Sequence, residues 1–162
     1  MNIDEHWDKI RAIFNEAFGS CFHYAVSTVN EDGSPQVIPI GGLVLREDRT
    51  GFFFDEYCVR TRENLRRDPR VCILAVNADR TFWGKSLAAG KFLSPPAVRL
   101  IGTAGAMREA TADEIAGFKN KVAYARGTKG YEKLWEPLYT VRDLKFDSFE
   151  TIETGEMTEG LW

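Results

Sequence analysis

Residues 51–77, GFFFDEYCVRTRENLRRDPRVCILAVN, carry the pattern that decides the fold. The run GFFFDEY is apolar and aromatic, as in a strand, and RVCILAVN is a continuous run typical of a strand buried on both faces. Between them, TRENLRRDP predicts a short polar helix that ends by Pro69, because the residue before a proline is disfavoured in the α region. The stretch therefore predicts a strand, a short helix and a second strand.

The sequence before this stretch predicts a helix followed by a hairpin. Apolar residues recur at steps of three and four over residues 4–18, and Gly19 follows as a stop signal, so we expect an amphipathic helix there. The β-rich runs CFHYAVSTV and SPQVIPIGGLVL then flank NEDG at 30–33, whose residues favour a hairpin turn.

The sequence after this stretch adds two strands and a helix. Residues 78–97 give mixed signals, with two glycines and a proline pair, and predict mainly an ordered loop with room for a short helical turn. VRLIGTAGAM is typical of a strand whose glycines mark a bulge or a close backbone approach. Thr111 and Glu114 have capping-box spacing, which predicts a helix to about Ala125, and LYTVRDLKFDSFETI predicts the last strand.

These elements favour a mainly β protein, a closed or nearly closed antiparallel barrel of about six strands with helices on its outside. A β-sandwich is the alternative. The length of 162 residues fits one domain over 1–162, with the helix at 4–18, the barrel at about 20–152 and a tail at 153–162.

Composition narrows the class of partner. With 21 Lys and Arg against 24 Asp and Glu, the chain lacks the basic excess of a nucleic-acid binder. No apolar run approaches the roughly 20 residues that span a bilayer, and no basic leader opens the chain, so we expect no membrane partner and a cytoplasmic protein. The three cysteines are unclustered and there are two histidines, so we expect no disulfide framework, metal site or Ser-His-Asp triad.

A group of polar side chains opens the short helix of the deciding stretch: Arg60, Thr61, Arg62 and Asn64. Free backbone N–H groups and the helix dipole favour an anion at that end of a helix, and guanidinium forks suit a phosphate. The alternative, a solvated basic helix face, is favoured for three later arginines: Arg66, Arg67 and Arg70.

The run T-R-x-N-L-R-x-D-P-R-V, together with the SPQVIPIG and FFFD strands and the order of elements, resembles the pyridoxamine 5′-phosphate oxidase-like, FMN-binding split-barrel proteins. The resemblance is strongest over residues 20–108. It implies a six-stranded antiparallel split β-barrel with outer helices that binds FMN. The C-terminal substrate segment of the true oxidase, a Trp followed by an Arg-rich sequence, has no counterpart here, so we do not expect the oxidase reaction itself.

The resemblance also implies a set of cofactor-binding residues. Five strand residues would lie against the edge of the flavin ring: Val37, Ile38, Pro39, Ile40 and Gly41. Phe54 and Asp55 would flank the ribityl chain, and Arg60, Thr61 and Arg62 would receive the phosphate. Family members usually carry Lys at the position of Thr61, so the phosphate would rest on backbone donors and the two arginines, with Arg62 contributing more than Arg60.

Two further residues are assigned to this site. Trp83 either covers the ring, binds a neighbouring subunit or forms a buried aromatic anchor. Arg99 corresponds to a position near the flavin in relatives, although such arginines also face solvent.

The resemblance finally implies a homodimer with the flavin at the subunit interface, where Trp83 and Trp162 are expected. An apolar slot, a few placed polar groups and an anion site suit a flavin. The expected activity is electron transfer between a reduced nicotinamide and an unidentified small-molecule acceptor. The alternatives are a flavin carrier or sensor without turnover, and a split barrel that binds a deazaflavin or haem.

Overall fold

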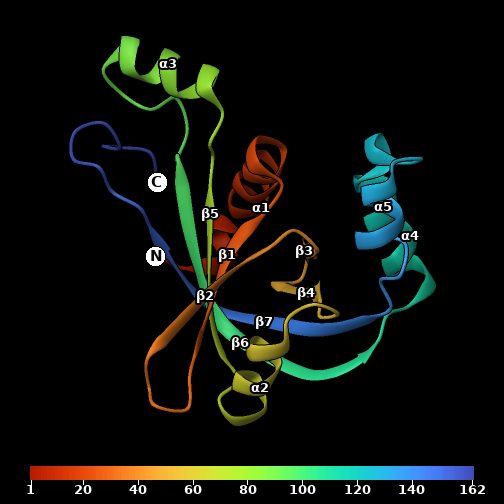
Figure 1. The fold of residues 1–162 in the computed structure, drawn as a ribbon. Coiled ribbons are helices and arrows are strands. Elements are labelled where there is room, and N and C mark those ends of the chain that lie inside the picture. The colour runs from red at the N-terminus through yellow and green to blue at the C-terminus, as the bar shows by residue number, and fades with distance from the viewer.

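The computed structural model describes all residues 1–162 and is built around one curled antiparallel sheet (Figure 1). Its seven strands lie in the order β2-β1-β5-β6-β7-β4-β3. Along the chain they are β1 (Tyr24–Val29), β2 (Pro35–Ile40), β3 (Leu43–Leu45), β4 (Thr50–Phe54), β5 (Arg70–Val76), β6 (Ala97–Glu109) and β7 (Thr140–Thr151). The mainly β split-barrel class is confirmed, with seven strands in place of the predicted six.

The additional strand arises because the run SPQVIPIGGLVL, predicted as one strand, breaks at Gly41 and Gly42. β2 pairs with β1 and β3 pairs with β4, so the two halves of the run form the two edges of the sheet. A Cβ on Gly41 would lie 2.8 Å from the Phe22 carbonyl oxygen, and one on Gly42 would lie 3.2 Å from the Phe54 Cβ. These glycines therefore form a tight corner through which the chain joins both edges of the curled sheet.

Two bulges bend the long strands β6 and β7. The register shifts between Ile101 and Gly102 and again between Ala104 and Met107. A Cβ on Gly102 would overlap the Lys145 carbonyl oxygen, so this crossing of the backbones requires glycine. The prediction of a bulge or close approach in this strand is confirmed.

The N-terminal helix α1 (Ile3–Cys21) packs against β5, β6 and β7. Its buried side chains share one face: Ile3, Trp7, Ile10, Ile13, Phe14, Ala17 and Phe18. The helix continues past Gly19, and Phe22 takes the left-handed cap with a φ of 63°. The Phe22 ring lies against the rings of Phe18 and Tyr124, so tertiary packing, and not the glycine, determines where this helix ends.

Two of the remaining helices agree with prediction. The short helix α2 (Val59–Arg67) follows β4, as expected. Helix α4 (Ala112–Lys121) begins with the predicted capping box, in which Thr111 Oγ1 accepts from the Glu114 N–H and the Glu114 carboxylate accepts from the Thr111 N–H. It ends earlier than expected, and a turn of 3₁₀ helix, η1 (Ala123–Ala125), follows it.

Two helices differ from prediction. The expected loop at 78–97 contains α3 (Arg80–Ala89), because Asp79 caps its first turn and Gly90, with a φ of 69°, ends it. Helix α5 (Lys129–Leu134), which is capped by Thr128, was not predicted. In Figure 1, α3 stands beyond the ends of β5 and β6, whereas α5 lies beside α4 at the other side of the molecule. No helix combines the length and the apolar character needed to cross a bilayer.

The tail after β7 folds back onto the same chain. The Phe92 N–H donates to the Met157 carbonyl oxygen at 2.8 Å, which ties the tail to the segment after α3. Trp162, for which a subunit interface is expected, packs on His6 and Phe149 of its own chain.

Candidate functional site

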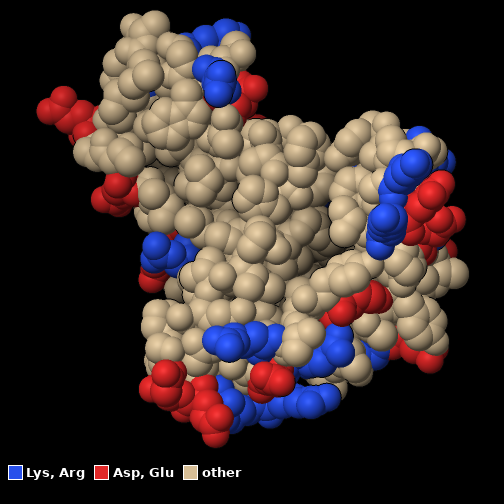
Figure 2. Space-filling view, in the orientation of Figure 1, with Lys and Arg blue, Asp and Glu red and all other residues tan.

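An apolar cavity of about 230 Å³ lies where the glycine corner, the end of β4, the start of α2 and α5 meet; we call it the apolar slot. Its lining consists of Pro39, Ile40, Gly41, Gly42, Phe54, Tyr57, Cys58, Leu134, Trp135 and Leu138. None of these residues carries a charge at neutral pH, and Figure 2 shows uncharged, hollowed surface between β3 and α5. Such a lining suits a flat, largely apolar ligand.

Aromatic contacts fix the walls of the slot. The Phe54 ring lies 5.2 Å from the Phe118 ring, centroid to centroid, and Phe118 in turn contacts the edge of Trp135. The Tyr57 hydroxyl donates to the Lys133 carbonyl oxygen at 2.8 Å, which links the start of α2 to α5. Burial raises the pKa of the Cys58 thiol to about 11, so this lining group is a neutral thiol at physiological pH.

The N-terminus of α2 opens beside the slot. Cys58 is the N-cap residue, and its side chain makes no capping hydrogen bond. The backbone N–H groups of the first helical turn therefore have no partner within the helix or the cap. This end of α2 offers donors and a positive dipole to an anion next to the slot.

The structure brings four of the predicted cofactor-binding residues together: Pro39, Ile40, Gly41 and Phe54 all line the slot. The other two predicted ring-edge residues, Val37 and Ile38, do not line it. Val37 is 62% exposed, and Ile38 packs against the core.

The two arginines predicted to share a phosphate have different surroundings. Arg60 lines a polar cleft beside the β1–β2 turn, together with Glu31 and Asp32. Arg62 turns inward, where its Nη2 donates to the Asp55 carbonyl oxygen and its Nε lies 3.6 Å from Asp55 Oδ2. Of the two, only Arg60 is free of a carboxylate ion pair.

Thr61 and Asn64 are buried and connect α2 to the β1–β2 hairpin. The Asn64 Nδ2 lies 3.0 Å from each of three acceptors, on Thr28, Asn30 and Gln36. The Thr61 hydroxyl lies 3.5 Å from the same Gln36 oxygen. These contacts hold the helix in position, and the predicted roles of both residues toward a cofactor stay predictions.

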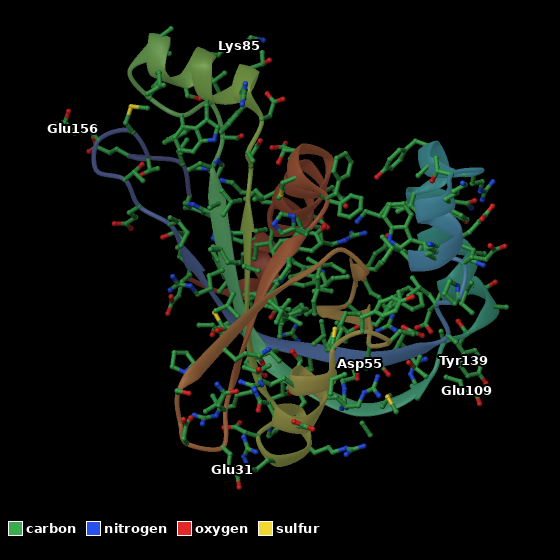
Figure 3. All side chains as sticks on the ribbon, in the orientation of Figure 1. Glu31, Asp55, Lys85, Glu109, Tyr139 and Glu156 are labelled. Atoms are coloured by element: carbon green, nitrogen blue, oxygen red, sulfur yellow. The ribbon has the colours of Figure 1, made fainter.

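Asp55 is fully buried between two arginines, beside α2 and β7 (Figure 3). Arg142 Nε donates to Asp55 Oδ2 at 2.6 Å, while Asp55 Oδ1 has no partner. Burial raises the pKa of this carboxyl, and the hydrogen bond and charge of Arg142 oppose that effect. The predicted contact with a ribityl chain stays a prediction, and in this structure the carboxylate is enclosed.

Trp83 and Arg99 do not line the slot of their own chain. The Trp83 Nε1 donates to the Asn77 carbonyl oxygen at 2.7 Å, and its ring packs edge-on against Phe92, as an aromatic anchor of α3 does. Arg99 pairs with Glu150 on the outer face of β6 and β7. In Figure 3, Lys85 marks α3, well apart from Asp55.

Sequence reasoning missed six slot residues: Gly42, Tyr57, Cys58, Leu134, Trp135 and Leu138. The adjacent pair Gly41 and Gly42 was a usable signal for a corner. Gly127 followed by Thr128 was a weak signal for the start of α5. Nothing local indicated that the end of α5 would meet the end of β4 at the slot.

A family model described as pyridoxamine 5′-phosphate oxidase matches residues 8–152. Among proteins with curated descriptions, no sequence matches this chain significantly.

Three solved structures share the fold. An FMN-binding protein from Syntrophomonas wolfei is 14% identical, with a TM-score of 0.58 over 94% of this chain and 95% of that one. HutZ, the heme storage protein from Vibrio cholerae, is 16% identical, with a TM-score of 0.53 over 93% and 95%. An F420 reductase is 13% identical, with a TM-score of 0.52 over 85% and 95%. At these identities the likeness shows the fold alone. The family match, which spans most of the sequence, shows that the chain belongs to the pyridoxamine 5′-phosphate oxidase family.

Proposed function

We propose that this protein is an FMN-binding flavoprotein that holds the flavin ring in the apolar slot and the phosphate at the start of α2. The observation that carries the proposal is an uncharged slot of about 230 Å³ directly beside the open N-terminus of α2. A flavin phosphate needs an apolar surface at one end and an anion site at the other, and the slot and α2 supply both. Family membership and an FMN-binding protein of the same fold support this choice of ligand.

Each part of the site has a binding role in this proposal. Pro39, Ile40 and Phe54 contact the ring, and Gly41 exposes backbone to its polar edge because it has no Cβ. The N–H groups of the first turn of α2 hold the phosphate, with Arg60 nearby. Arg62 acts indirectly, since it fastens the start of α2 to Asp55. When bound, FMN supplies two-electron chemistry, here between a reduced nicotinamide and an unidentified acceptor.

The proposal includes a homodimer that covers the slot. On the outer sheet face, Ser27, Cys72 and Ile101 pair across β1, β5 and β6 and are only half-buried. Near the slot, Tyr57 and Leu134 are 59% and 51% exposed. Accessible apolar side chains, such as those of Ile101, Tyr57 and Leu134, favour a partner surface, and a second copy would exclude water from the flavin.

The first test is the absorbance spectrum of the purified protein, followed by mass spectrometry of any released ligand. The expected result is a yellow protein that releases FMN, or a colourless one that takes up one FMN per chain. A colourless protein that takes up no added FMN removes the proposal. Turnover with NADH or NADPH and excess acceptor distinguishes an oxidoreductase from a flavin carrier or sensor.

Haem and deazaflavin are the competing ligands, since HutZ and the F420 reductase share the fold. Neither histidine lines the slot to serve as an axial ligand: the His6 ring packs on Phe149, and His23 Nδ1 lies 2.7 Å from the Cys21 carbonyl oxygen. This favours a flavin-type ring. A Soret band would identify haem, and mass spectrometry would distinguish a deazaflavin from FMN.

A further inference from the structure

A second cavity, of about 390 Å³, lies along the other half of α2; we call it the α2–bulge cavity. Leu65 and Arg66 of α2, the second β6 bulge at 104–107 and Arg142 of β7 line it. It shares no lining residue with the apolar slot. The proposed flavin site does not extend into this cavity.

Arg142 gives the cavity a fixed charged wall. The residue is 3% exposed, its Nε donates to Asp55, and its Nη1 donates to the Gly105 carbonyl oxygen at 3.0 Å. Its Nη2 makes no hydrogen bond within the chain. The guanidinium is thus held rigidly by two hydrogen bonds and still has free N–H groups that can bind an oxyanion. Because the side chain is already fixed, binding costs little rotamer entropy.

The local charge is positive and not balanced. Asp55 is the only carboxylate paired with Arg62 and Arg142, so these three groups carry a net charge of +1. Arg66 adds another positive charge at the cavity, is exposed and forms no ion pair. No acidic residue lines the cavity. Figure 2 shows Lys and Arg side chains over α2, with acidic side chains among them.

The rest of the cavity wall consists of apolar side chains and of the backbone at the β6 bulge. Leu65, Ala104 and Met107 contribute carbon surface, and Met107 is 41% exposed. At the bulge, Gly105 and Ala106 lie between Ala104, paired with Leu144, and Met107, paired with Arg142, so the ladder is interrupted there. This surface suits a small organic group attached to the anion.

We propose that the α2–bulge cavity binds a phosphate group, free or as a small phosphate monoester, through Arg142 and Arg66. The buried guanidinium of Arg142 donates directed hydrogen bonds to the phosphate oxygens. The exposed side chain of Arg66, at the edge of the cavity, adds a positive charge. This site is separate from the flavin phosphate site at the start of α2, and its occupation does not depend on whether the slot holds FMN.

The test is a calorimetric titration of the purified protein with inorganic phosphate and, separately, with phenyl phosphate. We expect Arg66→Glu to weaken both ligands by at least about tenfold, because an attractive charge at the rim becomes a repulsive one. Arg80→Glu is the matched control, since Arg80 is also an exposed helix arginine without an ion pair, and it should bind as the unmodified protein does. Tighter binding of phenyl phosphate would identify a monoester site, and equal binding a site for free phosphate.

Arg60→Glu distinguishes the two proposed phosphate sites. It should leave phosphate binding at the cavity intact, whatever it does to FMN binding. Phosphate binding that is lost in Arg60→Glu and kept in Arg66→Glu would place the ion at the start of α2 and overturn the inference. Equal affinities in Arg66→Glu and the unmodified protein, or no binding at all, would overturn it as well. Arg142→Lys keeps the charge and removes the planar guanidinium, and it should weaken the binding of both ligands.

Discussion

Arg142 and Asp143 are neighbours on β7, so their side chains point to opposite faces of the sheet, and each belongs to an arginine–carboxylate cluster. Asp143 lies in what we call the closed cluster, with Arg46, Arg108 and Glu114. Arg142 lies in the open cluster, with Asp55 and Arg62. The closed cluster contains two arginines and two carboxylates, whereas the open cluster contains two arginines and one carboxylate.

The two clusters also differ in how fully their atoms are paired. In the closed cluster, Arg108 bonds both oxygens of Glu114 and both oxygens of Asp143 at 2.6–2.9 Å, and Arg46 adds a bond to each residue. In the open cluster, Asp55 Oδ1 and Arg62 Nε have no partner although Asp55 is fully buried. The closed cluster is partly exposed and fully paired, so it serves to hold β3, β6, β7 and α4 together. A buried polar atom without a hydrogen-bond partner costs stability. Such atoms are found at ligand-binding and other functional sites.

The largest expected effect comes from removing the buried carboxylate. Asp55→Ala leaves Arg142 buried without its ion-pair partner, and we expect it to lower the free energy of unfolding by about 3–5 kcal/mol. Asp143→Ala, on a residue whose side chain is 44% exposed, should cost about 1 kcal/mol. Urea unfolding followed by circular dichroism measures both. Similar losses in the two variants would contradict the distinction between the clusters.

As the pH falls, we expect Glu114 in the closed cluster and Asp55 in the open cluster to change the stability of the fold in opposite directions. Arg108 lowers the pKa of Glu114 to about 2 from 4.5, so the stabilisation from Glu114 is complete above 4.5 and is lost as the pH falls toward about 2. Asp55 behaves oppositely, because burial raises its pKa and its protonation favours the folded state as the pH falls. The Glu114 contribution is on the order of 3 kcal/mol.

The measurement is the free energy of unfolding in urea as a function of pH. In Glu114→Gln, the free energy of unfolding should fall less steeply with decreasing pH, because the variant lacks a carboxyl group whose pKa is lowered in the folded state. In Asp55→Asn, the free energy of unfolding should fall more steeply with decreasing pH, because protonation of Asp55 stabilises the folded state and the variant lacks this effect. A flatter profile in Asp55→Asn would show that the carboxyl of Asp55 has a lowered pKa in the folded state.

The contrast between the clusters also shows where sequence reasoning works. Periodicity, the capping box and the glycines of β6 are local signals, and they predicted α1, the start of α4 and the bulges. By contrast, the direction in which a side chain points depends on residues that are far away in the sequence. Arg62 turns inward because Asp55 lies under α2, and Asp55 is held by Arg142, 87 residues further along the chain. The wall contributed by α5 is non-local in the same way, so only the part of the slot formed by β2, the glycine corner and β4 was predictable from sequence.

Arg60 and Arg62 should contribute differently to FMN binding, because only Arg62 is paired with Asp55. The sequence favours Arg62 as the stronger phosphate ligand, but the structure engages it with Asp55. We therefore expect Arg60→Ala to weaken FMN binding by about 1.5 kcal/mol, roughly tenfold. Arg62→Ala should lower stability and affect FMN binding less. Fluorescence titration with FMN, combined with urea unfolding and with Arg80→Ala as control, measures both; a larger loss of affinity in Arg62→Ala would restore the sequence-based assignment.

The smallest effect is expected at the two threonine caps, one beside the closed cluster and one beside the slot. Thr111→Ala removes one capping bond from α4 and should cost about 0.5–1 kcal/mol, because Arg46 and Arg108 still hold Glu114 in place. Thr128→Ala removes the corresponding bond from α5, which no ion cluster supports. Since α5 carries Leu134 and is followed by Trp135 in the slot wall, this second variant should also weaken FMN binding, whereas Thr111→Ala should not. Equal FMN affinities in both variants would mean that the wall formed by α5 does not depend on its cap and is held by aromatic packing alone.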